Sequence, residues 1–326
     1  MQYKQLGRSG LKVSRLCLGT MNFGWVTDEA TALSLMDRAL EMGINFWDTA
    51  DVYNGGESEV MIGRWFAEGE GRREKIVLGT KVFISKTDWP NFGKLSALNI
   101  RRSCEQSLRR LHTDYIDLYQ FHHIDRSTPW EEIWQATERL VQDGKIIYVG
   151  SSNFAGWHVA QANETARRRD FLGLVSEQSL YNLMERTAEL EVLPACQNYG
   201  LGVVTWSPLA GGLLAGMLHK AGHGRRAEGE MLLGHSSREQ RIESNRVNLR
   251  EYEKFCEAMG EKPADVALAW LLAQPGVTGP VTGPRTTDQL DSSLRALEIT
   301  MTAEILQKLD NIFPGPGGPA PEAYAW

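Results

Sequence analysis

Eight short apolar runs recur along the chain, and longer segments with helical spacing of apolar residues separate them. The runs cover residues 14–18, 45–47, 76–80, 116–121, 148–150, 174–177, 203–205 and 279–282. Alternation of this kind is typical of βαβ units, in which crossover helices join parallel strands. Eight such units can close into a ring, so the pattern predicts a (β/α)8 barrel, the TIM-barrel fold of the α/β class.

Two of the intervening segments show why helices are expected between the runs. Residues 30–41 carry leucine and methionine at helical spacing, and Gly43 follows, where a left-handed helix end suits glycine. Residues 131–141 follow Pro129, which suits a first helical turn, and they run into an Asp-Gly pair. Both segments therefore have a physical reason to begin and to end.

Three segments fall outside the repeat. Residues 3–6 and 11–13 flank a Gly-Arg-Ser-Gly turn, which predicts an N-terminal β-hairpin that could plug the bottom of the barrel. Residues 211–245 are polar and rich in glycine, which predicts a long loop after the seventh strand. Residues 313–326 hold so much proline and glycine that an extended C-terminal tail is expected instead of a helix. We find no linker, and residues 1–326 are predicted to form a single domain.

Composition narrows the classes of partner. Lys and Arg number 35 against 41 Asp and Glu, a formal net charge of -6, which argues against nucleic acid as a partner. The four cysteines form neither a CxxC pair nor a Cys/His cluster, so we expect no metal site and a reducing, cytoplasmic location. The N-terminus has no long apolar run, and we expect no signal peptide and no membrane partner. The sequence leaves open whether the chain forms a homo-oligomer.

Polar residues follow the predicted strands, at the end of a parallel barrel where active sites form. Asp48 ends the second strand and Tyr53 lies five residues later, while Lys81 ends the third strand and His122 follows the fourth. Polar or aromatic residues also follow the fifth, sixth and seventh strands: Ser152, Asn153, Gln178, Trp206 and Ser207. Each has an ordinary structural explanation when it is taken alone, such as a turn, a helix cap or a solvated edge. Their joint placement at one mouth favours a catalytic site.

Four of these residues suit the reduction of a carbonyl group: Asp48, Tyr53, Lys81 and His122, which follow the second, third and fourth predicted strands. The developing alkoxide needs a proton, and a tyrosine with a pKa near 10 is a poor donor at neutral pH. We expect the ammonium group of Lys81 to lower the pKa of Tyr53, and Asp48 to hold that lysine in place. His122 would orient the carbonyl oxygen or share in the proton relay. This chemistry requires no metal.

The segments DTADVY, LGTKV, LYQFHH and GSSNF resemble signature segments of the aldo-keto reductases, and the resemblance extends over nearly the whole chain. It implies NADPH-dependent reduction of a ketone or an aldehyde to an alcohol. The implied catalytic residues are Asp48, Tyr53, Lys81 and His122, with Tyr53 as general acid. His123 stands where a tryptophan or an arginine is common in that family.

The resemblance also implies which residues bind NADPH or NADP+, a cofactor that this family holds without a GxGxxG dinucleotide fold. They are Thr20, Met21, Asp48, Ser152, Asn153, Gln178, Trp206, Ser207, Leu209, Gly211, Gly283, Arg285 and Gln289. Among them, Trp206 would stack on the nicotinamide ring and Arg285 would pair with the 2′-phosphate. Related sequences often contact adenine through a Glu-Asn pair, whereas this chain has Ser292 and Ser293, so adenine contacts are not predicted.

Substrate and regulation allow several hypotheses. The segments FHHIDR, VGSSNFAGWHVAQA and APEAYAW resemble a bacterial, actinobacterial branch associated with secondary metabolism, which makes a polyketide or deoxysugar ketone a candidate small-molecule substrate. A broad-specificity aldehyde reductase fits the same residues, and reduction of an activated double bond is also open. Because some proteins with this fold act as cofactor-sensing regulatory subunits, a non-catalytic role is the alternative from another class.

Two peripheral segments are expected to shape binding. The loop 211–245 contains Lys220, Arg225 and Arg226, and we expect it to close over the bound cofactor. The tail 313–326 contains Tyr324 and Trp326, which a solvated tail does not need. We expect these two aromatic residues to contact the substrate pocket or a second subunit.

Overall fold

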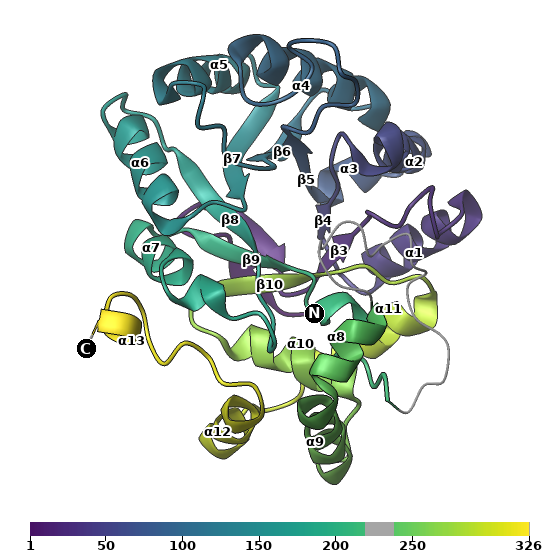
Figure 1. Ribbon diagram of the computed structural model, residues 1–326. Helices are drawn as coiled ribbons and strands as arrows, with labels where there is room; N and C mark the ends of the chain where they lie inside the picture. The colour runs from purple at the N-terminus through teal and green to yellow at the C-terminus, as the bar shows by residue number, and fades with distance from the viewer. Residues whose placement is uncertain (219–237, 326) are drawn as a thin grey trace.

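The computed structural model of the protein describes residues 1–218 and 238–325. Eight parallel strands form a closed barrel in the order β10-β3-β4-β5-β6-β7-β8-β9, with helices around it (Figure 1). The strands are β3 (Cys17–Gly19), β4 (Phe46–Asp48), β5 (Val77–Val82), β6 (Ile116–Phe121), β7 (Ile146–Ser152), β8 (Leu174–Leu180), β9 (Gly202–Trp206) and β10 (Val277–Thr282). The predicted (β/α)8 barrel is confirmed, and each of the eight apolar runs contributes to one of these strands.

The bounds of the first barrel strand differ from the prediction of residues 14–18. Ser14 ends the hairpin strand, and β3 begins three residues later at Cys17. The Ser14 hydroxyl donates to the carbonyl of Leu16 at 2.6 Å, and the Ser14 N–H donates to Asn45 Oδ1 at 2.7 Å. These local hydrogen bonds turn the chain between the two strands, which an apolar pattern alone does not reveal.

Helices surround the barrel on its outer side. They are α1 (Glu29–Glu41), α2 (Glu57–Ala67), α3 (Arg72–Lys75), α4 (Ala97–Leu111), α5 (Trp130–Gln142), α6 (Gly156–Arg167), α7 (Val192–Tyr199), α8 (Arg238–Ser244), α9 (Arg246–Ala258), α10 (Pro263–Ala273), α11 (Thr287–Ser293), α12 (Ala303–Ile312) and α13 (Glu322–Ala325). Short 3₁₀ turns are η1 (Tyr53–Gly56), η2 (Thr187–Glu189), η3 (Ala210–Gly212) and η5 (Leu294–Leu297). None of the helices described is long and apolar enough to cross a membrane.

The two helices predicted from the sequence are present with bounds shifted by one residue. The Asp28 side chain accepts from the Thr31 N–H at 2.8 Å and caps α1, and Gly43 adopts the expected positive φ of 76° after it. Helix α5 starts at Trp130, and Pro129 occupies the N-cap with extended backbone instead of the first turn.

The predicted N-terminal hairpin is confirmed. Strands β1 (Tyr3–Gln5) and β2 (Lys12–Ser14) pair antiparallel. Leu6 is completely buried and packs in the lower core of the barrel with side chains such as Phe46. The Arg8 N–H donates to the carbonyl of Gly200, which precedes β9, at 2.7 Å. The hairpin therefore closes the end of the barrel at which the strands begin.

The structure corrects two predictions outside the barrel. The segment 211–245 is not a loop throughout, because its last part forms α8, where the sequence REQRIES consists largely of good helix formers. Lys220, Arg225 and Arg226 lie outside the described residues. The tail is not entirely extended, because α13 forms directly after Pro321, a residue compatible with a helix start.

The tail lies beside the connection between β8 and α7. The Ala320 N–H donates to the carbonyl of Leu190 at 2.8 Å, and Arg186 Nη1 donates to the carbonyl of Phe313 at 3.1 Å. Tyr324 is 69% exposed, so this chain alone does not bury it. Trp326 lies outside the described residues.

Candidate active site

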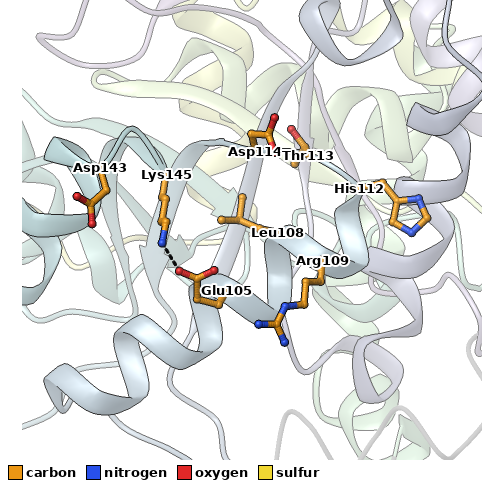
Figure 2. Close-up of a pocket in the computed structure, with 8 residues that line it drawn as sticks. All are labelled: Glu105, Leu108, Arg109, His112, Thr113, Asp114, Asp143 and Lys145. Carbon is orange, nitrogen blue, oxygen red and sulfur yellow. Dashed lines mark hydrogen bonds and ion pairs between the residues drawn. The ribbon is translucent and has the colours of Figure 1, made fainter.

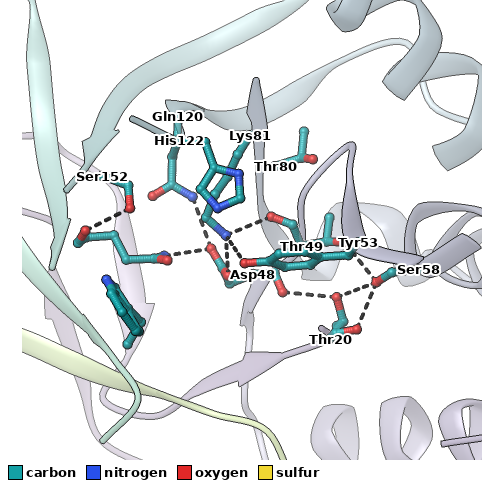
Figure 3. A network of polar contacts seen from close by, with 12 residues as sticks. Thr20, Asp48, Thr49, Tyr53, Ser58, Thr80, Lys81, Gln120, His122 and Ser152 are labelled. Atoms are coloured by element: carbon teal, nitrogen blue, oxygen red, sulfur yellow. Dashed lines mark hydrogen bonds and ion pairs between the residues drawn. The ribbon is translucent and has the colours of Figure 1, made fainter. Parts of the chain in front are cut away.

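A buried lysine is the centre of the polar group at the strand ends. Lys81 Nζ donates to Asp48 Oδ2 at 2.6 Å, to the Thr49 carbonyl at 2.9 Å and to the Tyr53 hydroxyl at 3.0 Å (Figure 3). Asp48 and Lys81 are brought together because β4 pairs directly with β5. The lysine side chain is completely buried, and its three N–H groups all have partners. Its orientation toward Tyr53 is therefore fixed.

The pKa shifts of Lys81 and Tyr53 agree only partly with the prediction. For Lys81, burial is the largest single influence and lowers the pKa, but the charges of Asp48 and Tyr53 and the hydrogen bonds to both together outweigh it, so the net pKa is raised. For Tyr53, burial raises the pKa and Lys81 lowers it, and burial prevails. The prediction of a net lowered pKa for Tyr53 was therefore wrong, since the sequence gives no measure of burial. A raised pKa keeps the phenol protonated at neutral pH, with a proton available to donate.

His122 completes the group, and its ring packs against that of Tyr53. The two rings lie edge to face, with centroids 5.8 Å apart and an interplanar angle of 80°. Burial, followed by the charges of Lys81 and His123, lowers the pKa of His122 to about 3. The imidazole is therefore neutral, and its buried Nδ1 has no hydrogen-bond partner among the described residues. A neutral imidazole can donate one hydrogen bond to a substrate oxygen.

Two glutamines secure Asp48 from the opposite side. Gln178 Nε2 donates to Asp48 Oδ1 at 2.8 Å, and Gln120 Nε2 donates to the same oxygen at 3.1 Å. Gln120 was missed by sequence reasoning. Its signal is a polar residue inside the apolar run of β6, two positions before His122 and thus on the same face of the strand.

Three of the predicted cofactor residues form a hydrogen-bonded chain across β7 and β9. Trp206 Nε1 donates to Asn153 Oδ1 at 3.0 Å, and Asn153 Nδ2 donates to Ser152 Oγ at 3.0 Å and to the His122 carbonyl at 3.1 Å. Asn153 has a positive φ of 59°, which is uncommon outside glycine. The asparagine thus links the proposed stacking tryptophan to the histidine segment.

Thr20 and Met21 follow directly after β3. The Thr20 hydroxyl donates to the Asp48 carbonyl at 3.0 Å and lies 2.7 Å from Ser58 Oγ. Thr20 is completely buried, whereas Met21 is partly exposed. Ser58 also lies 2.9 Å from Thr49 Oγ1, and this supporting hydroxyl was not predicted.

The segment after β9 has the backbone conformation expected for close approach of a ligand. Ser207 and Gly211 have positive φ values of 54° and 70°, and Leu209 lies between them. Buried Asn182 donates through Nδ2 to the Ser207 carbonyl at 3.0 Å and fixes this turn. Successive backbone N–H groups in such turns can bind anions.

The segment after β10 presents an arginine at the surface. Gln289 Oε1 accepts from the Arg285 N–H at 2.9 Å, and the carbonyl of Gly283 accepts from Asn22. Within residues 1–218 and 238–325, the Arg285 guanidinium makes no hydrogen bond or ion pair. Ser293 is buried and donates to the Leu290 carbonyl at 2.6 Å. Gln289 is therefore engaged within the protein, while Arg285 can meet a ligand.

A hollow lies at the end of the barrel opposite these residues. It has a volume of about 530 Å3 and is lined by the end of α4 and the residues before β6 and β7, and the ion pair of Glu105 with Lys145 lies in it (Figure 2). None of the predicted site residues lines it. Within the described ranges no group of three His, Cys, Asp or Glu side chains could hold a metal ion.

A parallel barrel with a buried Lys-Asp pair, a hydrogen-bonded tyrosine and a neutral histidine at its carboxyl end defines a TIM-barrel oxidoreductase. Residues 15–313 match the model of the aldo/keto reductase family. The chain belongs to this family and is an NAD(P)H-dependent oxidoreductase.

Relatives span nearly the full length. The chain is 55% identical to an uncharacterized oxidoreductase of Bacillus subtilis over 100% of both chains. It is 32% identical to versiconal hemiacetal acetate reductase of Aspergillus parasiticus, over 95% of this chain and 96% of that protein. It is also 34% identical to a putative voltage-gated potassium channel subunit beta of Schizosaccharomyces pombe, over 95% and 92%. The relatives thus include one named as a reductase and one named as a potassium channel subunit.

Proposed function

We propose that this protein reduces a ketone or an aldehyde to an alcohol with NADPH, and that Tyr53 is the general acid. The observation that carries the proposal is the contact of buried Lys81 Nζ with Asp48 at 2.6 Å and with the Tyr53 hydroxyl at 3.0 Å. A cation at this position has little effect on a neutral phenol but stabilises the phenolate that forms when the proton leaves. The arrangement therefore favours the product of proton transfer.

When bound, NADPH would supply the hydride that reduces the carbonyl carbon, and the residues of this chain handle the oxygen and its proton. The carbonyl oxygen accepts hydrogen bonds from the Tyr53 hydroxyl and from the neutral imidazole of His122. As negative charge develops on that oxygen, the Tyr53 proton moves to it and the alcohol forms. Lys81 stabilises the phenolate left behind, while Asp48 keeps the ammonium group protonated. Solvent then returns a proton to Tyr53.

The residues present fit a dinucleotide. Trp206 is partly exposed beside Asn153, where it can stack on the nicotinamide ring, and Asn153 Oδ1 retains a lone pair for the carboxamide. The turn from Ser207 to Gly211 offers backbone N–H groups for the pyrophosphate. Arg285 would pair with the 2′-phosphate, which supports NADPH over NADH.

The substrate class is the second part of the proposal. Similarity to a reductase named for versiconal hemiacetal acetate supports a small carbonyl compound, and we favour a ketone of secondary metabolism such as a polyketide or deoxysugar intermediate. Membership of the actinobacterial branch stays a prediction, since the relative at 55% identity comes from Bacillus subtilis. Broad-specificity aldehyde reduction is the competing hypothesis.

Similarity to a putative potassium channel subunit beta favours a second candidate, a cofactor-sensing regulatory subunit. The two candidates differ in turnover. We expect steady NADPH oxidation in the presence of a panel of generic aldehydes, aryl ketones and nucleotide-linked keto sugars. A regulatory subunit would bind NADPH without turnover on any member of the panel, and that result would contradict the catalytic proposal.

A further inference from the structure

Glu177 is a buried carboxyl group that the proposed mechanism does not use. It lies in β8 and is completely buried, yet it forms no ion pair with any residue of the described ranges. Its Oε1 accepts from the Phe154 N–H at 3.0 Å and from the Ser179 hydroxyl at 2.9 Å, and its Oε2 accepts from Ser151. A buried carboxylate without a cation opposes folding, so its presence calls for a compensating role.

Two of the three hydrogen bonds that the Glu177 side chain accepts come from one turn, residues 151–154, at the end of β7 before α6. Strand β8 holds this turn at two points, because the Asn153 N–H donates to the Gln178 carbonyl at 3.0 Å and the Phe154 N–H donates to Glu177. Between these two anchors Asn153 has a positive φ of 59°. Asparagine tolerates this conformation better than most non-glycine residues, and the two hydrogen bonds from the turn to β8 stabilise it further.

The side chain of Asn153 connects this turn to the proposed active site by hydrogen bonds. Its Oδ1 accepts from Trp206 Nε1 at 3.0 Å, and its Nδ2 donates to the His122 carbonyl at 3.1 Å. One amide therefore contacts both the tryptophan proposed to stack on nicotinamide and the segment of the proposed catalytic histidine. If the turn relaxed to a right-handed backbone, the Asn153 amide would point elsewhere and both contacts would be lost.

We propose that Glu177 is a positioning residue, which holds the turn 151–154 so that Asn153 aligns Trp206 and His122 for hydride transfer. The inference rests on the proposed function. Glu177 contacts no reactant and acts through the turn. Its loss should therefore weaken cofactor binding and slow turnover even in protein that remains folded.

The test compares two substitutions at this position with a matched control. Glu177→Met keeps a similar side-chain volume and removes both acceptor oxygens. Glu177→Gln keeps one acceptor oxygen for Phe154, and its amide can donate to Ser151. Asp117→Asn is the control, because Asp117 also accepts a backbone N–H, that of Leu78 at 3.0 Å, but lies near the start of β6, at the far end of the barrel.

NADPH affinity is measured by quenching of tryptophan fluorescence, turnover by NADPH oxidation, and folding by circular dichroism. We expect Glu177→Met to weaken NADPH binding by about tenfold or more, since both hydrogen bonds from the turn to the carboxyl group are lost, and to lower kcat. Glu177→Gln should stay within about threefold of the wild type, because it conserves the hydrogen bonds to the turn. Asp117→Asn should leave both the NADPH affinity and kcat unchanged, even if its melting temperature falls.

Ser151→Ala is a milder test that changes little volume. It removes one hydrogen bond to the carboxylate and should weaken NADPH binding in the same direction. Wild-type binding and turnover in Glu177→Met or in Ser151→Ala would overturn the inference while the proposed function stands. Equal losses in Glu177→Met and Asp117→Asn would also overturn it, since general destabilisation would then suffice. A wild-type protein that binds no NADPH would contradict the proposed function and this inference together.

Discussion

Replacement of Lys81 by methionine removes the cation and keeps most of the side-chain volume. The ammonium group lies 3.0 Å from the Tyr53 hydroxyl, a separation at which two unit charges interact by about 5 kcal/mol at an effective dielectric constant of about 20. The opposing charge of Asp48 cancels part of this, since it raises the pKa of Tyr53. A net loss of about 3–5 kcal/mol in stabilisation of the phenolate corresponds to roughly a 10²- to 10⁴-fold loss of kcat.

The substitution also leaves Asp48 buried without its cation, which costs about 3–5 kcal/mol of folding stability. The double variant Asp48→Asn with Lys81→Met removes that unpaired charge, so it should fold and still lose turnover. The assay is single-turnover NADPH oxidation at saturating substrate, with folding followed by circular dichroism. Lys145→Met, which breaks the partly exposed ion pair with Glu105, serves as the control and should turn over normally. A folded double variant with a rate within threefold of the wild type would refute the reasoning.

Three further outcomes are expected. Arg285→Ala should weaken NADPH by about ten- to a hundredfold and leave NADH unchanged in cofactor titrations, and equal loss of both would refute a 2′-phosphate contact. Burial raises the pKa of Glu177 to about 7; since the folded state then binds the extra proton, wild-type stability should fall as pH rises from about 4.5 to 7, by up to about 3 kcal/mol, relative to Glu177→Gln in urea titrations. A pH-independent difference would contradict that shift. Deletion of residues after Phe313 should change substrate KM or the mass by light scattering, not NADPH affinity; no change in either would leave the tail without a role.

The barrel was predictable from the sequence because eight buried parallel strands require eight apolar runs. The polar residues after those strands were then expected to lie together, since the carboxyl ends of all strands in a parallel barrel are at the same end. Tyr53 and Lys81 were predicted correctly as neighbours, since β4 and β5 are adjacent in any such barrel. The sign of the Tyr53 pKa shift was not predictable, because it depends on the balance of burial against one cation at 3.0 Å.

The supporting polar residues were missed for a different reason. Gln120 and Glu177 lie within apolar strands, where a single polar residue does not change the pattern that predicts the strand. Their function becomes visible only when the partner strand is known, because each contacts a residue from another strand. Helix α8 was missed because its helix-forming residues follow a glycine-rich stretch and were averaged with it.

The central claim, that Tyr53 donates the proton, is tested most directly by Tyr53→Phe. The hydroxyl accepts a hydrogen bond from Lys81 and is proposed to donate to the substrate oxygen, and no proposed cofactor contact involves it. The account predicts that this variant binds NADPH with the wild-type Kd, keeps its circular dichroism spectrum and loses turnover by about 10²-fold or more. Near-normal turnover in the folded Phe variant would show that another group is the acid and would contradict the mechanism.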